Sequence, residues 1–224
     1  GSGSGAHYGA GAGQRGGDDN ASGVAAMLEC ARALIVVKTD RRIAFVAFDA
    51  EEIQSPGEGL HGSTAFVSQL APDESPVAAI IFESVGFSST TEKQRLPGSF
   101  RFLFRRAYRA LVRQNFSAES LLILSRGPGR AISRELEKSA SDPAIQLRIL
   151  PLEVPKWMPL VRNLRRSDHA PFWLAGIPAV MISDTANFRN PHYHQPTDIP
   201  GTVDAGLVAN AARMVIDAIG RGAF

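Results

Sequence analysis

The chain has little of three features that would indicate a disulfide-stabilised, membrane-spanning or nucleic-acid-binding protein. It contains one cysteine, Cys30, in 224 residues, which excludes an internal disulfide framework and a cysteine-based zinc site. No apolar run reaches the roughly 18 residues that a membrane span needs. The net charge of +2 is too small to indicate nucleic acid as a partner. Cys30 lies in a helical apolar pattern, so we expect a buried, small hydrophobic side chain there.

The remainder of the chain has the pattern of a globular α/β protein. Its length suits one domain with a substantial core. We expect strands at residues 43–48, 77–84, 145–150 and 178–184. We expect helices at residues 22–37, 62–70, 100–116 and 203–219. This alternation favours a mostly parallel, mixed central sheet flanked by helices.

Two further stretches carry weaker predictions. The expected helix at 100–116 is amphipathic with arginines on one face, and we interpret that face as solvated rather than nucleic-acid-binding. Residues 151–159 contain three prolines and Trp157, which suggests an ordered loop.

The first 17 residues, GSGSGAHYGAGAGQRGG, resemble a flexible linker. Gly-rich chain loses more conformational entropy on ordering than any other. We therefore expect residues 1–17 to be a Gly-rich segment joined to a domain of residues 18–224. We find no basic and then apolar leader in this segment, so the sequence alone leaves the localisation unknown.

Histidine and carboxylate side chains at five places in the sequence are candidates for metal binding or acid–base catalysis. Several carboxylates follow predicted strands, and in open α/β sheets that edge is where ligands bind. The candidates are His7, Asp19, the pair Glu51–Glu52, Glu83 and His194. Taken singly, each is more often an ordinary surface or loop residue. Together they match the donor set of a zinc site, or of a manganese or cobalt site, with a carboxylate left over as general base.

Five segments, in this order, resemble the co-catalytic zinc aminopeptidase family. They are GAHY, GGDDNASGVAAMLECARAL, RRIAFVAFDAEE, HGS and SDHAPFWLAGIPAVMISDTANFRNPHYHQPTD. The family also includes glutamate carboxypeptidase, glutaminyl cyclase and, as a non-catalytic relative, the transferrin-receptor ectodomain. The resemblance runs from about residue 5 to 219 and is weakest between 88 and 165. It implies a single zinc-exopeptidase-like domain and suggests a secreted or periplasmic location.

The resemblance also implies a role for each candidate. One zinc ion would be held by His7, Asp19 and Glu83, and the other by Asp19, Glu52 and His194. Glu83 falls where most members have a ligand aspartate, and a subset has glutamate. Glu51 matches the general base that activates a metal-bound water. Asp168 and His169 match a motif beside the site, where we expect them to support it or line its pocket rather than bind metal.

The sequence departs from the family pattern at two places. Gly9 stands where the family usually has an aspartate that supports the first histidine. Family members also lead into that histidine with an apolar strand, which GSGSG is not. We therefore expect Gly-rich chain in place of the N-terminal strand, and one zinc ion rather than two if His7 is not a ligand.

The leading hypothesis is a metal-dependent exopeptidase, most simply an aminopeptidase, acting on a peptide or a small aminoacyl substrate. The alternatives are a non-catalytic binding module and a glutaminyl-cyclase-like acyltransferase with one zinc held by Asp19, Glu52 and His194. We expect the substrate pocket to come from residues 88–165, with Trp157, Met158 and Phe172 as apolar candidates that core packing explains equally well. The sequence leaves the oligomeric state open.

Overall fold

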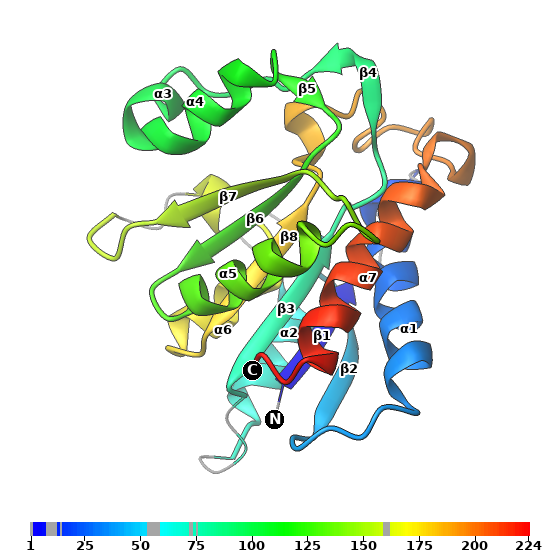
Figure 1. Cartoon of the computed structure of the whole chain (residues 1–224), viewed down its shortest axis with the longest axis vertical. Helices are drawn as coiled ribbons and strands as arrows, with labels where there is room; N and C mark the ends of the chain where they lie inside the picture. Colours follow the sequence, from blue (N-terminus) through cyan, green and yellow to red (C-terminus); the bar gives the residue numbers. More distant parts are fainter. Residues whose placement is uncertain are drawn as a thin grey trace.

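The computed structural model describes residues 2–7, 13, 15–52, 59–71, 74, 76–158 and 162–224. Its centre is a six-stranded sheet with the strand order β2-β1-β3-β8-β6-β7 (Figure 1). These strands are β1 (Ser2–His7), β2 (Ile43–Phe48), β3 (Ala78–Glu83), β6 (Leu121–Arg126), β7 (Ile149–Val154) and β8 (Ala179–Ser183). All neighbours are parallel except β6 and β8, which confirms the mostly parallel, mixed sheet.

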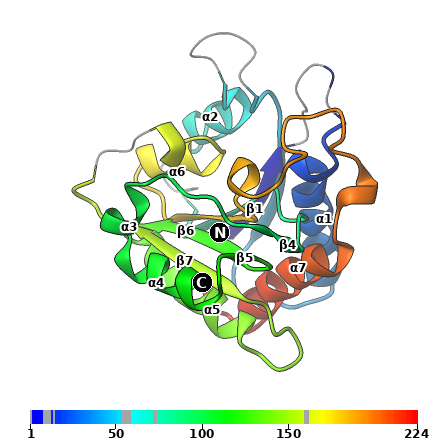
Figure 2. The ribbon, with the colours of Figure 1, turned by 90° about the horizontal axis from the view of Figure 1, so that it is seen from above.

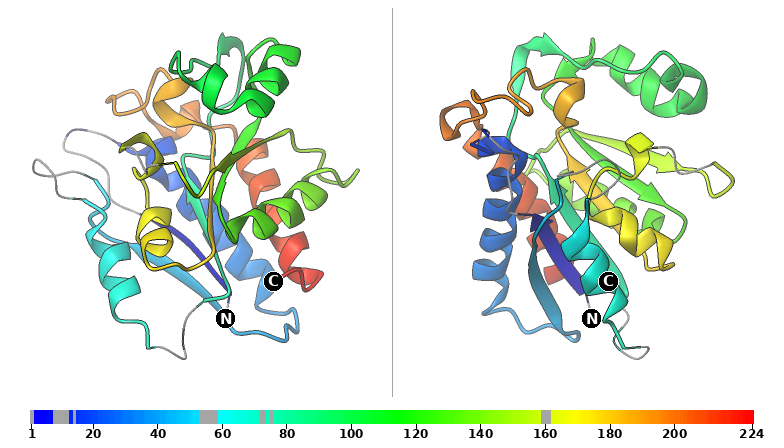
Figure 3. Two further views of the ribbon diagram at one scale, coloured as in Figure 1. Left: turned by 90° about the vertical axis from the view of Figure 1, so that its left-hand side faces the viewer. Right: turned by 180° about the vertical axis from the view of Figure 1, so that it is seen from behind.

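Helices cover both faces of the sheet (Figure 2). The helices are α1 (Gly23–Leu34), α2 (His61–Ser68), α3 (Phe100–Leu103), α4 (Arg105–Arg113), α5 (Gly129–Ala140), α6 (His169–Leu174) and α7 (Ala205–Gly220). Helices α1, α5 and α7 pack on one face, and α2 and α6 pack on the other. Helices α3 and α4, with the small ladder of β4 (Ser89–Lys93) and β5 (Ser117–Ala118), overhang one end of the sheet (Figure 3).

The buried strands supply side chains to both faces. Along β3, Ile80 and Phe82 enter the core under α1 and α7, while Ala79 and Ile81 enter the core under α2 and α6. This alternation is the period-2 geometry of a strand. A strand covered on both faces is apolar along its length, which is why the runs at 77–84 and 178–184 were recognisable. Cys30 is fully buried in the α1–α7 core, as expected.

The prediction that Gly-rich chain replaces the N-terminal strand is wrong. Ser2–His7 forms β1, an inner strand that pairs in parallel with both β2 and β3. The two neighbouring backbones satisfy its hydrogen bonds, so β1 needs no apolar side chains to be held. The Phe48 ring lies so close over Gly5 that a Cβ there would approach Phe48 Cε2 to 2.7 Å. Glycine at this position therefore allows a packing contact that a larger residue would block.

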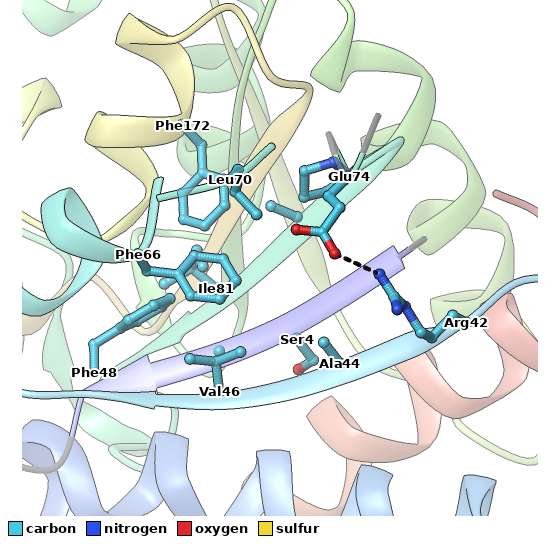
Figure 4. A pocket seen from close by; sticks show the side chains of 13 residues that line it. Ser4, Arg42, Ala44, Val46, Phe48, Phe66, Leu70, Glu74, Ile81 and Phe172 are labelled. Atoms are coloured by element: carbon cyan, nitrogen blue, oxygen red, sulfur yellow. Dashed lines mark ion pairs between the residues drawn. The ribbon is translucent and has the colours of Figure 1, made fainter. Parts of the chain in front are cut away.

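The small side chains of β1 leave a cavity of about 240 Å³ on the α2–α6 face (Figure 4). Phe48, Phe66 and Phe172 form its aromatic wall, with ring centroids 5.7–6.2 Å apart. An ion pair at 3.7 Å between Arg42 and Glu74 lies at its edge. The cavity thus lies beneath the strand that carries His7, on the side of the sheet away from α1 and α7.

Other boundaries differ from the predictions. The strand expected at 145–150 is β7, which begins at Ile149 and continues through Pro151 into the expected loop. The helix expected at 100–116 is broken at Phe104 into α3 and α4. The helices expected at 22–37, 62–70 and 203–219 are confirmed as α1, α2 and α7. Within the described part of the chain, no helix is both long and apolar enough to cross a membrane.

Candidate functional site

Five of the sequence-predicted residues meet at the carboxyl edge of the parallel strands. His7 is the last residue of β1 and Glu83 is the last residue of β3. Asp19 lies in the turn Gly17–Ser22 that leads into α1. Glu52 follows β2, and His194 lies in the loop that precedes α7. Parallel strands end at one edge, so the topology gathers side chains that are far apart in sequence.

The inner triad is defined as His7, Asp19 and Glu83. His7 Nε2 lies 3.1 Å from Glu83 Oε2 and 3.6 Å from Asp19 Oδ1. All three residues are buried. Two of them end central strands, so the rigid sheet sets their separation.

The outer triad, defined as Asp19, Glu52 and His194, shares Asp19 through its other oxygen. His194 Nε2 lies 3.1 Å from Asp19 Oδ2 and 3.5 Å from Glu52 Oε1. These three atoms are buried, yet none has a hydrogen-bond partner of good geometry. Glu52 and His194 are only half-buried as residues. The outer triad is therefore the more open of the two.

Both triads fit a metal ion. In each, the candidate ligand atoms all lie within 4.8 Å of one another. Imidazole nitrogens with carboxylate oxygens, and no thiolate, are a donor set typical of zinc. Buried polar atoms in native structures are nearly always satisfied, so the orphaned atoms of the outer triad need a partner. A cation placed among them would supply it.

Glu51 lies beside the inner triad, with Oε2 at 3.8 Å from His7 Nε2. The turn that follows β2 has Ala50 in the left-handed region, at φ 49°. The chain thus bends there, and Glu51 approaches His7 while its neighbour Glu52 approaches His194. Burial raises the pKa of Glu51 well above its usual value, and the nearby Glu83 carboxylate raises it further.

The two histidines are strongly basic in the protein. Burial would lower the pKa of His7, but the charges of Glu83, Glu51 and Asp19 outweigh it and raise that pKa to about 11. Contacts with Asp19 and Glu52 raise the pKa of His194 to about 10. Without a metal, a proton on each ring therefore takes the place of a cation.

The pKa values of the two carboxyl groups in the inner triad shift in opposite directions. Burial raises the pKa of Asp19 to about 7, against a smaller lowering by His194. Burial also opposes ionisation of Glu83, but His7, Ser167 and Ser84 outweigh it and lower its pKa to about 2. Glu83 is therefore the permanently charged partner of His7.

A hydrogen-bond network that the sequence analysis missed holds Asp19 in place. The Asp198 carboxylate accepts from the main-chain N–H groups of Asp18 and Asp19, at 2.8 and 3.0 Å. Asn20 donates to the carbonyl of Phe82 at 3.0 Å and accepts from the Ser84 N–H at 2.9 Å. The shared ligand is thereby tied both to β3 and to the loop that carries His194. In the sequence, the presence of Asp198 in the HQPTD segment was the one signal that could have pointed to this network.

Asp168 and His169, predicted to support the site or line its pocket, lie at the start of α6, and their role stays a prediction. Asp168 is fully buried next to α6, and burial raises its pKa to about 6, with Ser63 and His7 acting against the rise. His169 Nε2 lies 3.1 Å from the carbonyl of Leu164, and its ring meets the edge of Trp173 at 4.5 Å. Neither belongs to a metal-binding group among the described residues.

Three further residues beside the site were not predicted. The Ser167 hydroxyl donates to Glu83 Oε2 at 2.7 Å. The Tyr193 ring stacks on His194 at 4.0 Å between centroids, and its hydroxyl accepts from Arg166 at 2.9 Å. Burial raises the pKa of Tyr193 above its usual value, as do Asp19 and Glu83 nearby. Ser167 and Tyr193 lie inside the last of the five family-like segments and Arg166 directly precedes it, so their place in or beside that segment was the only signal in the sequence.

The other histidines lie outside both triads. His61 is exposed at the start of α2, and His192 is half-buried with Nδ1 at 3.0 Å from the Thr197 hydroxyl. Gly9, where the family pattern has an aspartate, lies outside the described residues.

A second, larger cavity of about 440 Å³ opens onto the inner triad. Glu83 of the inner triad borders it, together with His169 and Tyr193. Its walls come from α3, β6, β7 and β8 and from the segment around Trp157 and Met158. The 240 Å³ cavity of Figure 4 reaches none of the triad residues.

Comparison with known sequences finds one matching family model and several related proteins. The family model for peptidase family M28 matches residues 4–130 and 152–219. A protein of Escherichia coli (strain K12) named YfbL, described as uncharacterized, is 30% identical over 210 residues, which cover 90% of this chain and 58% of that protein. Aminopeptidase YwaD of Bacillus subtilis (strain 168) is 32% identical over 122 residues, covering 52% of this chain and 26% of that one.

Comparison with solved structures supports the same fold. The structure of BSAP, a zinc aminopeptidase from Bacillus subtilis, superposes with a TM-score of 0.71 at 24% identity. The match covers 99% of this chain and 45% of that chain. The chain thus spans about half the length, or less, of these characterised relatives.

Proposed function

The chain belongs to peptidase family M28, and on that premise we propose that it is a two-zinc aminopeptidase that hydrolyses the N-terminal bond of peptides or of small aminoacyl substrates. The observation that carries the proposal is that Asp19 presents one oxygen to each of two triads. A carboxylate shared between two ions is the arrangement of two-metal hydrolases. The names of the relatives, zinc aminopeptidase and aminopeptidase, support the same reaction class.

The residues of the two triads would hold the ions. Bound zinc lowers the pKa of water and polarises a carbonyl oxygen. The chain supplies the enclosure, because His7, Asp19 and Asp168 are buried. Exclusion of bulk water strengthens the electrostatic interactions between these groups and a substrate.

Glu51 is the proton acceptor in this proposal. Its carboxylate lies beside His7 of the inner triad but belongs to neither ligand group. An enclosed carboxylate with a raised pKa can take a proton from water and pass it to a leaving amine. Tyr193, whose pKa is also raised, keeps its proton, so its hydroxyl can donate to a substrate oxygen at the same edge.

The one-zinc acyltransferase alternative needs only the outer triad. The presence of His7 and Glu83 on the other side of Asp19, with Glu51 beside them, favours a two-ion hydrolase. The orphaned ligand atoms of the outer triad argue against a binding module without metal.

The test is zinc content and activity measured on one protein. Protein dialysed against zinc should contain two ions by elemental analysis and hydrolyse aminoacyl p-nitroanilides. Glu51→Gln should retain both ions and lose about 10²–10⁴-fold in kcat, the contribution typical of a general base. Glu29→Gln on the exposed side of α1 is the matched control and should be fully active. Absence of zinc uptake, or an active Glu51→Gln, would contradict the proposal, and cyclisation of an N-terminal glutaminyl peptide would favour the alternative.

A further inference from the structure

The overhanging helices α3 and α4 present a surface that the proposed function does not use. We call it the arginine face, and it consists of Arg101, Arg105, Arg106, Arg109 and Arg113. The four arginines of α4 follow one another at steps of one, three and four residues, so they fall on one side of that helix. Ala107 and Leu111 on the opposite side are buried in the core below. The arginine side chains are exposed and therefore point away from the core and from the candidate site.

The positive charge of the arginine face is not neutralised within the protein. Residues 93–118 include seven basic side chains and no acidic one, whereas the rest of the chain is net acidic. Arg95 nearby forms an ion pair with Glu92 at 3.4 Å. Among the residues that the structure describes, none of the five arginines of α3 and α4 has such a partner. The chemistry that this face would recognise is therefore anionic.

Large apolar side chains are exposed beside these arginines. Phe102 is 66% exposed, Leu103 is 48% exposed, and Val112, which directly precedes Arg113, is 50% exposed. Trp157 is 76% exposed and borders the 440 Å³ cavity together with Leu103, so the two lie on one rim. Basic side chains mixed with exposed large apolar ones are typical of a surface that lies in the interface of a membrane, where tryptophan is also enriched.

The position of the arginine face makes it accessible to an extended partner. Helices α3 and α4 overhang one end of the sheet, whereas the loop that joins α1 to β2 lies at the opposite end of the molecule (Figure 1, Figure 3). A flat surface could thus meet α3 and α4 first.

We propose that the arginine face docks the protein on an anionic lipid bilayer, with the arginines at the headgroups and Phe102 and Leu103 at the boundary of the acyl chains. This role does not depend on the proposed peptidase activity. A nucleic acid also offers phosphates, but proteins bind its single strands by stacking bases on aromatic rings. The Arg101 guanidinium already lies over the Phe102 ring, at 4.5 Å from its centroid. A bilayer, in contrast, would cover the exposed phenylalanine and leucine.

The first measurement is co-sedimentation of the whole protein with lipid vesicles. The protein should bind vesicles of phosphatidylcholine with about 30% phosphatidylglycerol, which have a negative surface potential, and should not bind vesicles of phosphatidylcholine alone. Raising the ionic strength from about 0.1 M to about 1 M shortens the Debye length from about 10 Å to about 3 Å and should release the protein. Equal binding to the two kinds of vesicle, or no binding to the anionic kind, would overturn the proposal.

Two matched variants connect binding to the arginine face. The first combines Arg105→Gln, Arg106→Gln, Arg109→Gln and Arg113→Gln. It should weaken binding by about 10²–10³-fold, since each basic residue near an anionic surface contributes about a factor of five. Glutamine is a good helix former, so α4 should remain folded, which circular dichroism checks.

The control variant removes the same charge at the opposite end of the molecule. It combines Arg32→Gln, Lys38→Gln, Arg41→Gln and Arg42→Gln, all at exposed positions. It should weaken binding by less than about fivefold, the contribution of a single contacting residue. Equal weakening in the two variants would overturn the proposal. Hydrolysis of a soluble aminoacyl p-nitroanilide should be the same in both variants as in the wild type, so a failure of docking and a failure of the proposed function are distinguishable.

Tryptophan fluorescence tests which side chains meet the bilayer. The emission of Trp157 should shift to shorter wavelength with anionic vesicles, because the exposed ring leaves water. Trp173, whose indole N–H donates to the Ala179 carbonyl at 2.9 Å, should not respond. Trp157→Phe should abolish the shift and retain co-sedimentation, and a shift that persists in this variant would contradict the proposed orientation.

Competition distinguishes a bilayer from other anionic partners. Duplex DNA and polyglutamate are the soluble probes, and an excess of either should leave the protein on anionic vesicles. Displacement by one of them, without a shift of Trp157 emission on vesicles, would overturn the proposal in favour of a nucleic acid or an acidic protein. Phe102→Ser combined with Leu103→Ser should weaken vesicle binding and leave its salt dependence unchanged, since both arginine-bearing helices keep their charge.

Discussion

The inner and outer triads share one aspartate but are built differently. His7 and Glu83 of the inner triad end neighbouring strands of the sheet, and both are buried. Glu52 and His194 of the outer triad lie on loops and are half-buried, and His194 has a left-handed backbone at φ 57°. The inner triad is thus positioned by the sheet, whereas the outer triad is positioned by loop conformation and by the Asp198 carboxylate, which ties the loop of His194 to the main chain of Asp19. We expect the first to be fixed before metal arrives and the second to depend on it.

The largest effect should follow from removing what the triads share. Asp19→Ala deletes a ligand oxygen from both, so zinc content should fall from two ions to none and activity should be lost. The fold should survive, because Asp198 holds this turn through main-chain N–H groups. Elemental analysis and circular dichroism check both statements. A variant that still binds one ion would show that one triad works without Asp19.

Deleting one histidine from each triad measures how different their surroundings are. In the metal-free protein, His7→Ala leaves buried carboxylates without their cation and should cost about 3–5 kcal/mol of unfolding free energy. His194→Ala removes a partly exposed partner and should cost about 1 kcal/mol or less. Urea unfolding of the two variants gives both values. Equal losses would remove the distinction between the triads.

Supporting residues should separate the triads by metal affinity. Asp198→Asn disturbs the shared aspartate, so affinity at both sites should fall by about 10–100-fold. Ser167→Ala removes the hydroxyl that donates to Glu83 Oε2, so only the inner site should weaken. Calorimetric zinc titration resolves the two sites. A weakening of the outer site by Ser167→Ala would contradict this assignment.

The smallest expected effect is a dependence of the protein's stability on pH. The native metal-free protein keeps protons on His7 up to a pKa of about 11 and on Asp19 up to about 7, above their unfolded values. It therefore binds more protons than the unfolded chain, and its stability should fall as pH rises above 6.5. Zinc needs the deprotonated ligands, so zinc-loaded protein should show the opposite slope between pH 6.5 and 9. Thermal unfolding at fixed zinc, with and without chelator, compares the two curves.

The sequence identified the parts of the fold that have an apolar pattern. Strands β3 and β8 were predicted because they are buried on both faces. The edge strand β2 was predicted because its short apolar run, Ile43–Phe48, is followed by an acidic pair, although Ala44 and Ala47 are exposed. No element was assigned to 117–144, where β6 and α5 lie, since a short apolar run such as LLIL does not distinguish strand from helix. Strand β7 was misplaced because Pro151 suggested a loop. The strand tolerates it because β7 is at the sheet edge, with one open side.

The residues of the site that lie in sequence motifs could be predicted. All five residues proposed as ligands converge, in the two groups that the family resemblance implied, and their roles as ligands stay a prediction. Asp198, Ser167 and Tyr193 were missed because their importance arises from contacts between distant segments. A single sequence carries no record of such contacts. The same limit applies to the 440 Å³ cavity, whose walls come from four strands and helices.

Strand β1 has an ambiguity of alignment that its neighbours do not have. A slip of two residues along β2 would exchange serine for serine and glycine for glycine over residues 2–5, and a slip of two residues keeps the alternation of the strand. The observed pairing aligns His7 with Phe48 and Gly5 with Val46. The end of the strand, where His7 meets Glu83 and Phe48 covers Gly5, is thus what distinguishes the correct alignment from the slipped one. The residues proposed to hold the metal ions thus also set the register of the strand that carries His7.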